Sequence, residues 1–114
     1  MILILEDNPE KIRNLLYKFG NEHLPGNRVV IVDSVADAKA VCRLMPMEEL
    51  NLWLDNEVKG SETGTDFLQF ILAERKHWLE SVMLITLNRS AQSIMKALCE
   101  EHGVAHTIWA GPFG

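Results

Sequence analysis

Five short, largely apolar runs, each separated from the next by a segment with helical periodicity, constrain the fold of this chain more than any other feature. The runs are Ile2–Leu5, Arg28–Val32, Leu50–Leu54, Val82–Thr86 and His106–Ala110. Runs of this length without polar alternation are typical of strands that are buried on both faces. We therefore expect a sheet of five strands.

The segments between these runs carry apolar residues at the i, i+3, i+4, i+7 spacing of an amphipathic helix. The four sets are Ile12, Leu15, Leu16 and Phe19; Ala38, Val41, Cys42 and Met45; Leu68, Ile71 and Leu72; and Ala91, Ile94, Met95 and Leu98. Residues of the helix-capping type, Asn8, Ser34 and Ser90, precede three of these sets. Four helices are predicted, one after each of the first four strands.

Strict alternation of strands and helices predicts a parallel sheet with right-handed crossovers and helices on both faces. Five strands in a chain of 114 residues fit a doubly wound, flavodoxin-like α/β sheet with strand order 2-1-3-4-5. We expect one domain over residues 1–114, with a final helix that is absent or vestigial.

Composition narrows the setting in which the chain works. The net charge of -5 gives no basic footprint for nucleic acid, and the longest apolar run is far shorter than the roughly 20 residues of a membrane span. The N-terminus lacks the basic region of a signal peptide. Cys42 and Cys99 fall in predicted helices without a metal-binding spacing, so we expect reduced core thiols and a cytoplasmic protein.

Three carboxylates follow the two strands that flank the expected switch point of this sheet. Glu6 and Asp7 come after the first strand, and Asp55 comes after the third. Neighbouring parallel strands lie about 4.8 Å apart, so these acids should share one pocket. We expect them to bind Mg²⁺ or Mn²⁺, which would organise a phosphate group. The alternative is that they are ordinary loop acids and helix caps.

Two polar residues at the end of the fourth run would face the same pocket. Thr86 supplies a hydroxyl and Asn88 an amide, and both groups can hold phosphate oxygens. The alternative is that Thr86 merely ends a strand and that Asn88 is an ordinary turn former.

Together these residues resemble the receiver domains of bacterial two-component signalling, and the similarity spans nearly the whole chain. In that family an acidic pair and an Asp bind Mg²⁺, the Asp accepts a phosphoryl group, and a Ser or Thr ends the fourth strand. Glu6–Asp7, Asp55 and Thr86 occupy these positions here. Gly111 stands where the family has a lysine that contacts the phosphoryl group.

The chain also resembles a receiver-like family that is thought to process cyclic phosphates. "LDNEVKGSETG" and "ITLN" lie over its two motifs. The residues in register are Asp55, Gly60, Thr63, Gly64, Thr86, Asn88 and Met95. The resemblance implies phosphate-binding roles for Gly64, Thr86 and Asn88. Asn56 and Ile85 replace the family's two histidines, and Glu57 replaces an Asp, so the usual general acid and base are missing.

Three functions remain open at this point. The chain could be a metal-dependent phosphoesterase acting on cyclic or terminal nucleotide phosphates, with Asp55 as nucleophile or metal ligand. It could be a stand-alone phosphoacceptor receiver that is phosphorylated on Asp55. It could also be a pseudo-receiver that has kept the fold and binds a protein partner in trans.

Overall fold

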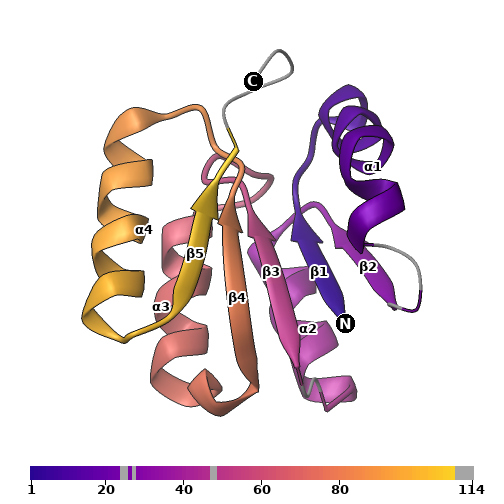
Figure 1. Cartoon of the computed structure of the whole chain (residues 1–114). Coiled ribbons are helices and arrows are strands. Elements are labelled where there is room, and N and C mark those ends of the chain that lie inside the picture. Colours follow the sequence, from indigo (N-terminus) through magenta and orange to yellow (C-terminus); the bar gives the residue numbers. More distant parts are fainter. Residues whose placement is uncertain (24–25, 27, 47–48, 110–114) are drawn as a thin grey trace.

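The computed structural model describes residues 1–23, 26, 28–46 and 49–109, and it shows a five-stranded sheet flanked by four α-helices (Figure 1). The expected Gly111 position lies outside these residues. The elements in order are β1 (Ile2–Leu5), α1 (Pro9–His23), β2 (Val29–Val32), α2 (Val35–Leu44), β3 (Leu50–Leu54), α3 (Gly64–Glu74), the 3₁₀ turn η1 (Lys76–Trp78), β4 (Leu79–Leu84), α4 (Arg89–Glu101) and β5 (Ala105–Ile108).

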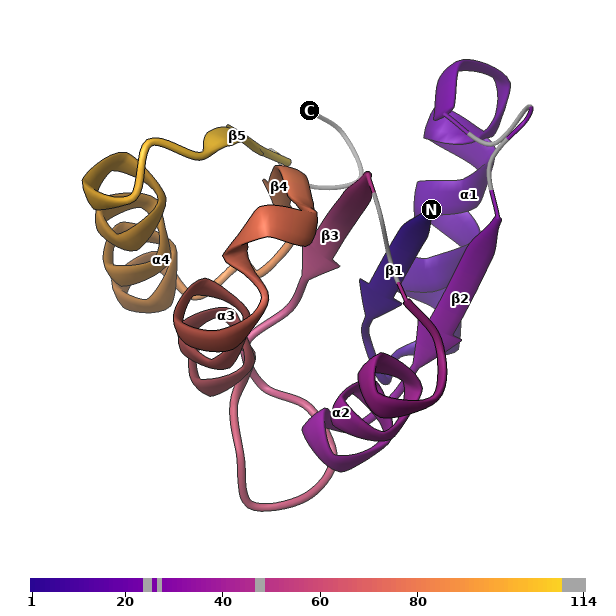
Figure 2. The same cartoon turned by 90° about the horizontal axis from the view of Figure 1, so that it is seen from below.

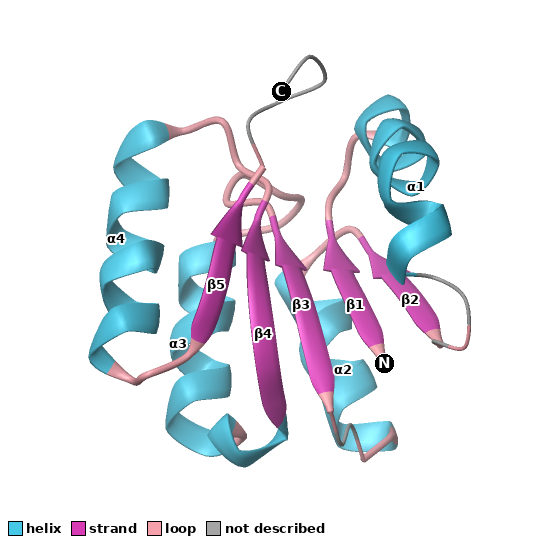
Figure 3. Cartoon of the chain, in the orientation of Figure 1, coloured by secondary structure: helices cyan, strands magenta, loops and turns pink. Residues whose placement is uncertain are grey.

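The sheet is entirely parallel, and its strand order is β2-β1-β3-β4-β5 (Figure 3). The predicted fold class is therefore confirmed. In this order the chain leaves β1 toward one side of the sheet, and β3 returns to pair with β1 on the other side. Leu5 at the end of β1 is in register with both Val32 of β2 and Leu54 of β3, so the residues that follow β1 and β3 emerge side by side.

Two hydrophobic clusters lie on the two faces of the sheet. Helices α2, α3 and α4 cover one face, and α1 covers part of the other (Figure 2). Alternate residues of one strand serve different clusters: Leu3 of β1 belongs to the first, and Ile4 belongs to the second, which includes Leu15 of α1. This two-sided burial explains why the central strands read as continuous apolar runs.

The last two strands differ from the prediction. β4 begins at Leu79 and ends at Leu84, not at Val82 and Thr86, and β5 is largely exposed. Among the described helices, α1 alone lies on the second face, so β5 has a helix on one side only. A groove of about 530 Å³ runs there, and its walls include Phe19, Trp53 and Trp109.

Both cysteines are buried in the first cluster as free thiols, and burial raises the pKa of each thiol. Within the described part of the chain, no helix has the length and apolar character needed to cross a membrane.

Candidate metal and phosphate site

The acidic residues emerge from the sheet on a backbone that is fixed by strand pairing. The amide of Glu6 donates to the carbonyl of Val32 at 3.0 Å, and the amide of Asp55 donates to the carbonyl of Leu5 at 3.0 Å. The hydrogen-bond ladder thus continues one residue past the ends of β1 and β3. Sheet geometry, and not loop conformation, sets the spacing of these two acids.

The three predicted acids do come together. Glu6, Asp7 and Asp55 each offer a carboxylate oxygen, and these oxygens lie within 4.8 Å of one another. Glu6 is 1% exposed and Asp55 is 7% exposed. Three oxygen ligands at this separation suit a hard divalent cation such as Mg²⁺ or Mn²⁺, so the donor set fits the ion that the sequence predicts.

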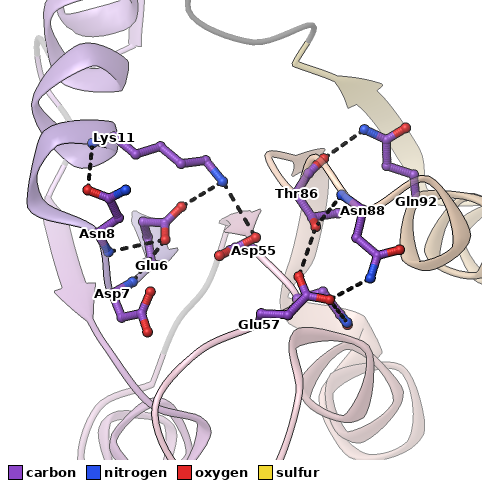
Figure 4. A network of polar contacts seen from close by, with 10 residues as sticks. Glu6, Asp7, Asn8, Lys11, Asp55, Glu57, Thr86, Asn88 and Gln92 are labelled. Atoms are coloured by element: carbon purple, nitrogen blue, oxygen red, sulfur yellow. Dashed lines mark hydrogen bonds and ion pairs between the residues drawn. The ribbon is translucent and has the colours of Figure 1, made fainter.

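The two oxygens of Glu6 have different surroundings (Figure 4). Oε2 accepts hydrogen bonds from the backbone amides of Asp7 at 3.0 Å and Asn8 at 3.3 Å. Oε1 instead faces the ammonium Nζ of Lys11, which lies 2.8 Å away in a charge-assisted ion pair. The same Nζ lies 3.5 Å from Oδ1 of Asp55. Lys11 therefore sits between two of the three acids.

The electrostatics of Glu6 follow from this placement. Burial raises the pKa of its carboxyl above the ordinary value, and the negative charge of Asp55 raises it further. The ammonium of Lys11 acts in the opposite direction. The net effect is a raised pKa, with burial as the largest cause.

The opposite wall of the pocket carries the two predicted phosphate contacts. Thr86 is fully buried, and its hydroxyl accepts a hydrogen bond from the amide of Asn88 at 3.1 Å. Oδ1 of Asn88 accepts from the amide of Ala91 at 3.1 Å. Asn88 is thus the N-cap of α4, and the expected cap at Ser90 is wrong because Ser90 already lies inside the helix. This leaves the Nδ2 group of Asn88 pointing away from the helix.

Glu57 occupies the donors of that wall (Figure 4). Nδ2 of Asn88 donates to Oε1 of Glu57 at 2.5 Å, and the hydroxyl of Thr86 lies 3.5 Å from Oε2. Nδ2 of Asn56 donates to Oε1 as well, at 3.1 Å. These hydrogen bonds, with that from Asn56 first, lower the pKa of the Glu57 carboxyl. The groups predicted to hold phosphate oxygens therefore already hold a carboxylate.

Gly64 is placed by contact with the backbone of Asp55. A Cβ atom at Gly64 would lie 1.7 Å from the carbonyl oxygen of Asp55, and the amide of Gly64 donates to the carbonyl of Asn56 at 2.9 Å. Packing against the backbone is thus enough to explain why residue 64 is a glycine. The role of Gly64 in phosphate binding remains a prediction.

The two residues at the positions of the missing histidines supply no general acid or base to the pocket. Ile85 packs in the second hydrophobic cluster, and Oδ1 of Asn56 accepts from Thr65 of α3. His106 contacts the carbonyl of Val104 at 3.0 Å on β5. Among the residues whose side chains are described, no imidazole reaches the three acids.

Sequence reasoning missed Lys11 and did not assign a partner to Glu57. Lys11 lies four residues after Asp7, in the first turn of the helix that follows β1. A basic residue there can reach back toward the carboxyl end of β1, and this signal could have pointed to it. Glu57 contacts Asn88, which lies 31 positions later in the sequence, and a single sequence contains no local signal of such a contact.

Comparison with known proteins gives structural neighbours only. No protein-family model matches the chain, and no curated protein sequence matches it significantly. The adenylate cyclase from Rhodopirellula baltica has 18% identity and a TM-score of 0.67, over 96% of this chain and 75% of that chain. The MaeR response regulator bound to beryllium trifluoride has 28% identity and a TM-score of 0.60, over 85% of this chain and 75% of that chain.

The chain has a receiver-like fold. The response regulator supports the description of this fold as receiver-like. The cyclase, at 18% identity, shows a similar fold and nothing more. The acidic cluster of this receiver-like domain lies after β1 and β3, where the strand order reverses.

Proposed function

We propose that this receiver-like domain binds a divalent cation, Mg²⁺ or Mn²⁺, together with a phosphoryl group at Asp55. The observation that carries the proposal is the convergence of three carboxylate oxygens within 4.8 Å, facing a wall with a hydroxyl and an amide donor. A cation bound by Glu6, Asp7 and Asp55 would neutralise the acids and supply positive charge to phosphate oxygens.

The residues of this chain have distinct parts in such a site. The carboxylate of Asp55 lies between the acidic wall and the donor wall (Figure 4), where it can contact phosphorus or attack it. In an attack, an Asp55 oxygen forms the new bond to phosphorus as the donor's leaving group departs with its electron pair. Thr86 and Asn88 donate hydrogen bonds to the phosphoryl oxygens.

Processing of a cyclic or terminal nucleotide phosphate is the further activity that the family resemblance implies. With no described imidazole in the pocket, hydrolysis would depend on metal-activated water or on attack by Asp55. The geometry therefore favours binding or transfer of a phosphoryl group over general acid–base hydrolysis.

A second candidate is a pseudo-receiver that works through contact with a protein partner in trans. The observation that favours it is the presence of Lys11 against the acids and of Glu57 against Thr86 and Asn88. The proposed cation position is thus next to a lysine of the same chain, and the proposed phosphoryl position is next to a glutamate of the same chain.

Calorimetric titration with Mg²⁺, followed by beryllium trifluoride in the presence of Mg²⁺, tests the proposed function. Beryllium trifluoride is an inorganic mimic of a phosphoryl group on a carboxylate. We expect both to bind the wild type, and we expect Asp55→Asn to lose the anion. Absence of Mg²⁺ binding, or equal anion binding by Asp55→Asn, would exclude the proposal and favour the pseudo-receiver.

Two activity assays separate the finer alternatives. A stable phosphoryl adduct after incubation with acetyl phosphate and Mg²⁺, seen by intact mass and absent in Asp55→Asn, would identify a phosphoacceptor. Metal-dependent hydrolysis of a 2′,3′-cyclic nucleotide that Asp55→Ala abolishes would identify a phosphoesterase.

A further inference from the structure

We infer that the pocket carries its own counterions, with Lys11 competing with the divalent cation and Glu57 competing with the phosphoryl group. This inference rests on the proposed function, and it assigns to these two residues the control of affinity at that site. Neither residue is a predicted ligand of either ion.

The cation side depends on which oxygen Lys11 contacts. The Oε2 atom of Glu6 is held by two backbone amides, so Oε1 is the atom left to bind a metal. The Lys11 ammonium lies 2.8 Å from this Oε1 and 3.5 Å from Oδ1 of Asp55. A divalent cation that used both oxygens would have to displace the ammonium.

The position of Lys11 is set by the start of α1. Oδ1 of Asn8 accepts from the amides of Glu10 at 3.0 Å and Lys11 at 3.4 Å, which fixes the first turn of the helix next to Glu6. The Lys11 side chain is 13% exposed, so most of it is shielded from water. A partly buried ion pair is screened less by salt than a surface pair, and its loss must be offset by the incoming ion.

The anion side follows the same logic. Glu57 accepts from Nδ2 of Asn88 and lies within reach of the Thr86 hydroxyl. These are the donors that would contact phosphoryl oxygens, and a negative charge beside them repels a second anion. A phosphoryl group therefore has to displace Glu57, whose own exposed position gives it room to move.

Mg²⁺ titration by calorimetry tests the cation side with Lys11→Met, which keeps the aliphatic length and removes the charge. We expect the variant to bind Mg²⁺ about tenfold more tightly, because no ion pair has to be broken. Lys11→Arg should keep the wild-type affinity. Lys39→Met is the matched control, because Lys39 pairs with Glu62 outside the pocket, and it should also keep the wild-type affinity.

Thermal unfolding gives a second readout that does not depend on tight binding. In EDTA, Lys11→Met should melt at a lower temperature than the wild type, because the three acids lose their cation. Saturating Mg²⁺ should reduce or reverse that difference. Lys11→Gln, which also lacks the charge, replaces Lys11→Met in both assays if the latter does not fold in EDTA.

Beryllium trifluoride titration in saturating Mg²⁺ tests the anion side. Glu57→Gln should bind the anion more tightly than the wild type, by roughly tenfold. Glu62→Gln, a carboxylate in the same loop that pairs with Lys39, should bind it as the wild type does.

The outcomes separate this inference from the proposed function. If the wild type binds Mg²⁺ and the anion while Lys11→Met and Glu57→Gln show unchanged or weaker affinity, the counterion inference is overturned and the proposed function stands. If none of the proteins binds Mg²⁺, both are overturned. Tighter binding by the two variants, with unchanged controls, supports both.

Discussion

The Oδ1 atom of Asn56 accepts two hydrogen bonds from Thr65, one from its amide at 3.1 Å and one from its hydroxyl at 2.7 Å. Asn56 stands where the cyclic-phosphate-processing family has a histidine. Its side-chain oxygen connects the loop after β3 to the first turn of α3. The side chain at this position thus has a structural role in this chain.

We predict that Asn56→Ala lowers the free energy of unfolding by about 1–3 kcal/mol, because both Thr65 donors lose a partly buried acceptor. Chemical denaturation measures the change. Gln69→Ala removes an exposed amide from the same helix and should have a much smaller effect. Equal losses in the two variants would contradict the role of this contact.

Gly64→Ala should destabilise the protein by roughly 2–4 kcal/mol, because the new methyl group would overlap the carbonyl of Asp55 and push α3 away from β3. The variant should also bind Mg²⁺ more weakly, since Asp55 has to move. Ser61→Ala in the same loop is the control for thermal unfolding and should leave the melting temperature near that of the wild type.

Asp55→Asn should raise the free energy of unfolding in metal-free buffer by roughly 1 kcal/mol. The change removes one of three close negative charges, and the contact that it loses with Lys11 is long, at 3.5 Å. Denaturation in EDTA at neutral pH measures the effect. A decrease would mean that the attraction of Asp55 to Lys11 outweighs its repulsion from Glu6 and Asp7.

The raised pKa of Glu6 makes the metal-free protein less stable as the carboxyl ionises. Below its ordinary pKa of 4.5, Glu6 is protonated in both the folded and the unfolded state, and the stability from its neutral form is fully present. That stability is lost as the pH rises through the higher folded-state pKa. The window therefore begins near pH 4.5 and extends upward.

Denaturation in EDTA at several pH values tests this prediction. The difference in free energy of unfolding between Glu6→Gln and the wild type should grow as the pH rises through that window. A constant difference for Glu6→Gln would show that Glu6 titrates alike in both states.

Trp109 should report Mg²⁺ binding through fluorescence. Nζ of Lys11 lies 5.6 Å from the centroid of the Trp109 ring, so departure of the ammonium removes a positive charge from beside the indole. Trp109→Phe should lose most of the emission change, and Trp78→Phe should keep it. Trp53, two residues before Asp55 in the sequence, contacts Phe19 within the second cluster.

The arrangement of the sheet could be predicted because the central strands are buried on both faces and their sequences are continuously apolar. β5 could not be placed as well. Its residues 105–108 include His106 and Thr107, and with a helix on one side only they are largely exposed. The prediction that β5 is buried on both faces required a helix over its second face, and the described residues form no helix there.

The acids of the site could be predicted for a related reason. Strand register alone brings the residues after β1 and β3 together, and register follows from the topology. Lys11 and Glu57 could not be placed in this way, because their roles depend on how far a flexible side chain reaches from a helix and a loop. Such contacts become visible only in the three-dimensional structure.

The contact between Gly64 and the Asp55 carbonyl bears on how relatives of this chain could be recognised. The requirement for glycine comes from two backbones that touch, and it is independent of any ion or substrate. A lineage that lost the acids would still have to keep this glycine in order to keep α3 against β3. The residue pair Thr63–Gly64, in which Thr63 caps the helix that Gly64 begins, is therefore explained by the packing of the fold, and it is no evidence that two proteins share a chemistry.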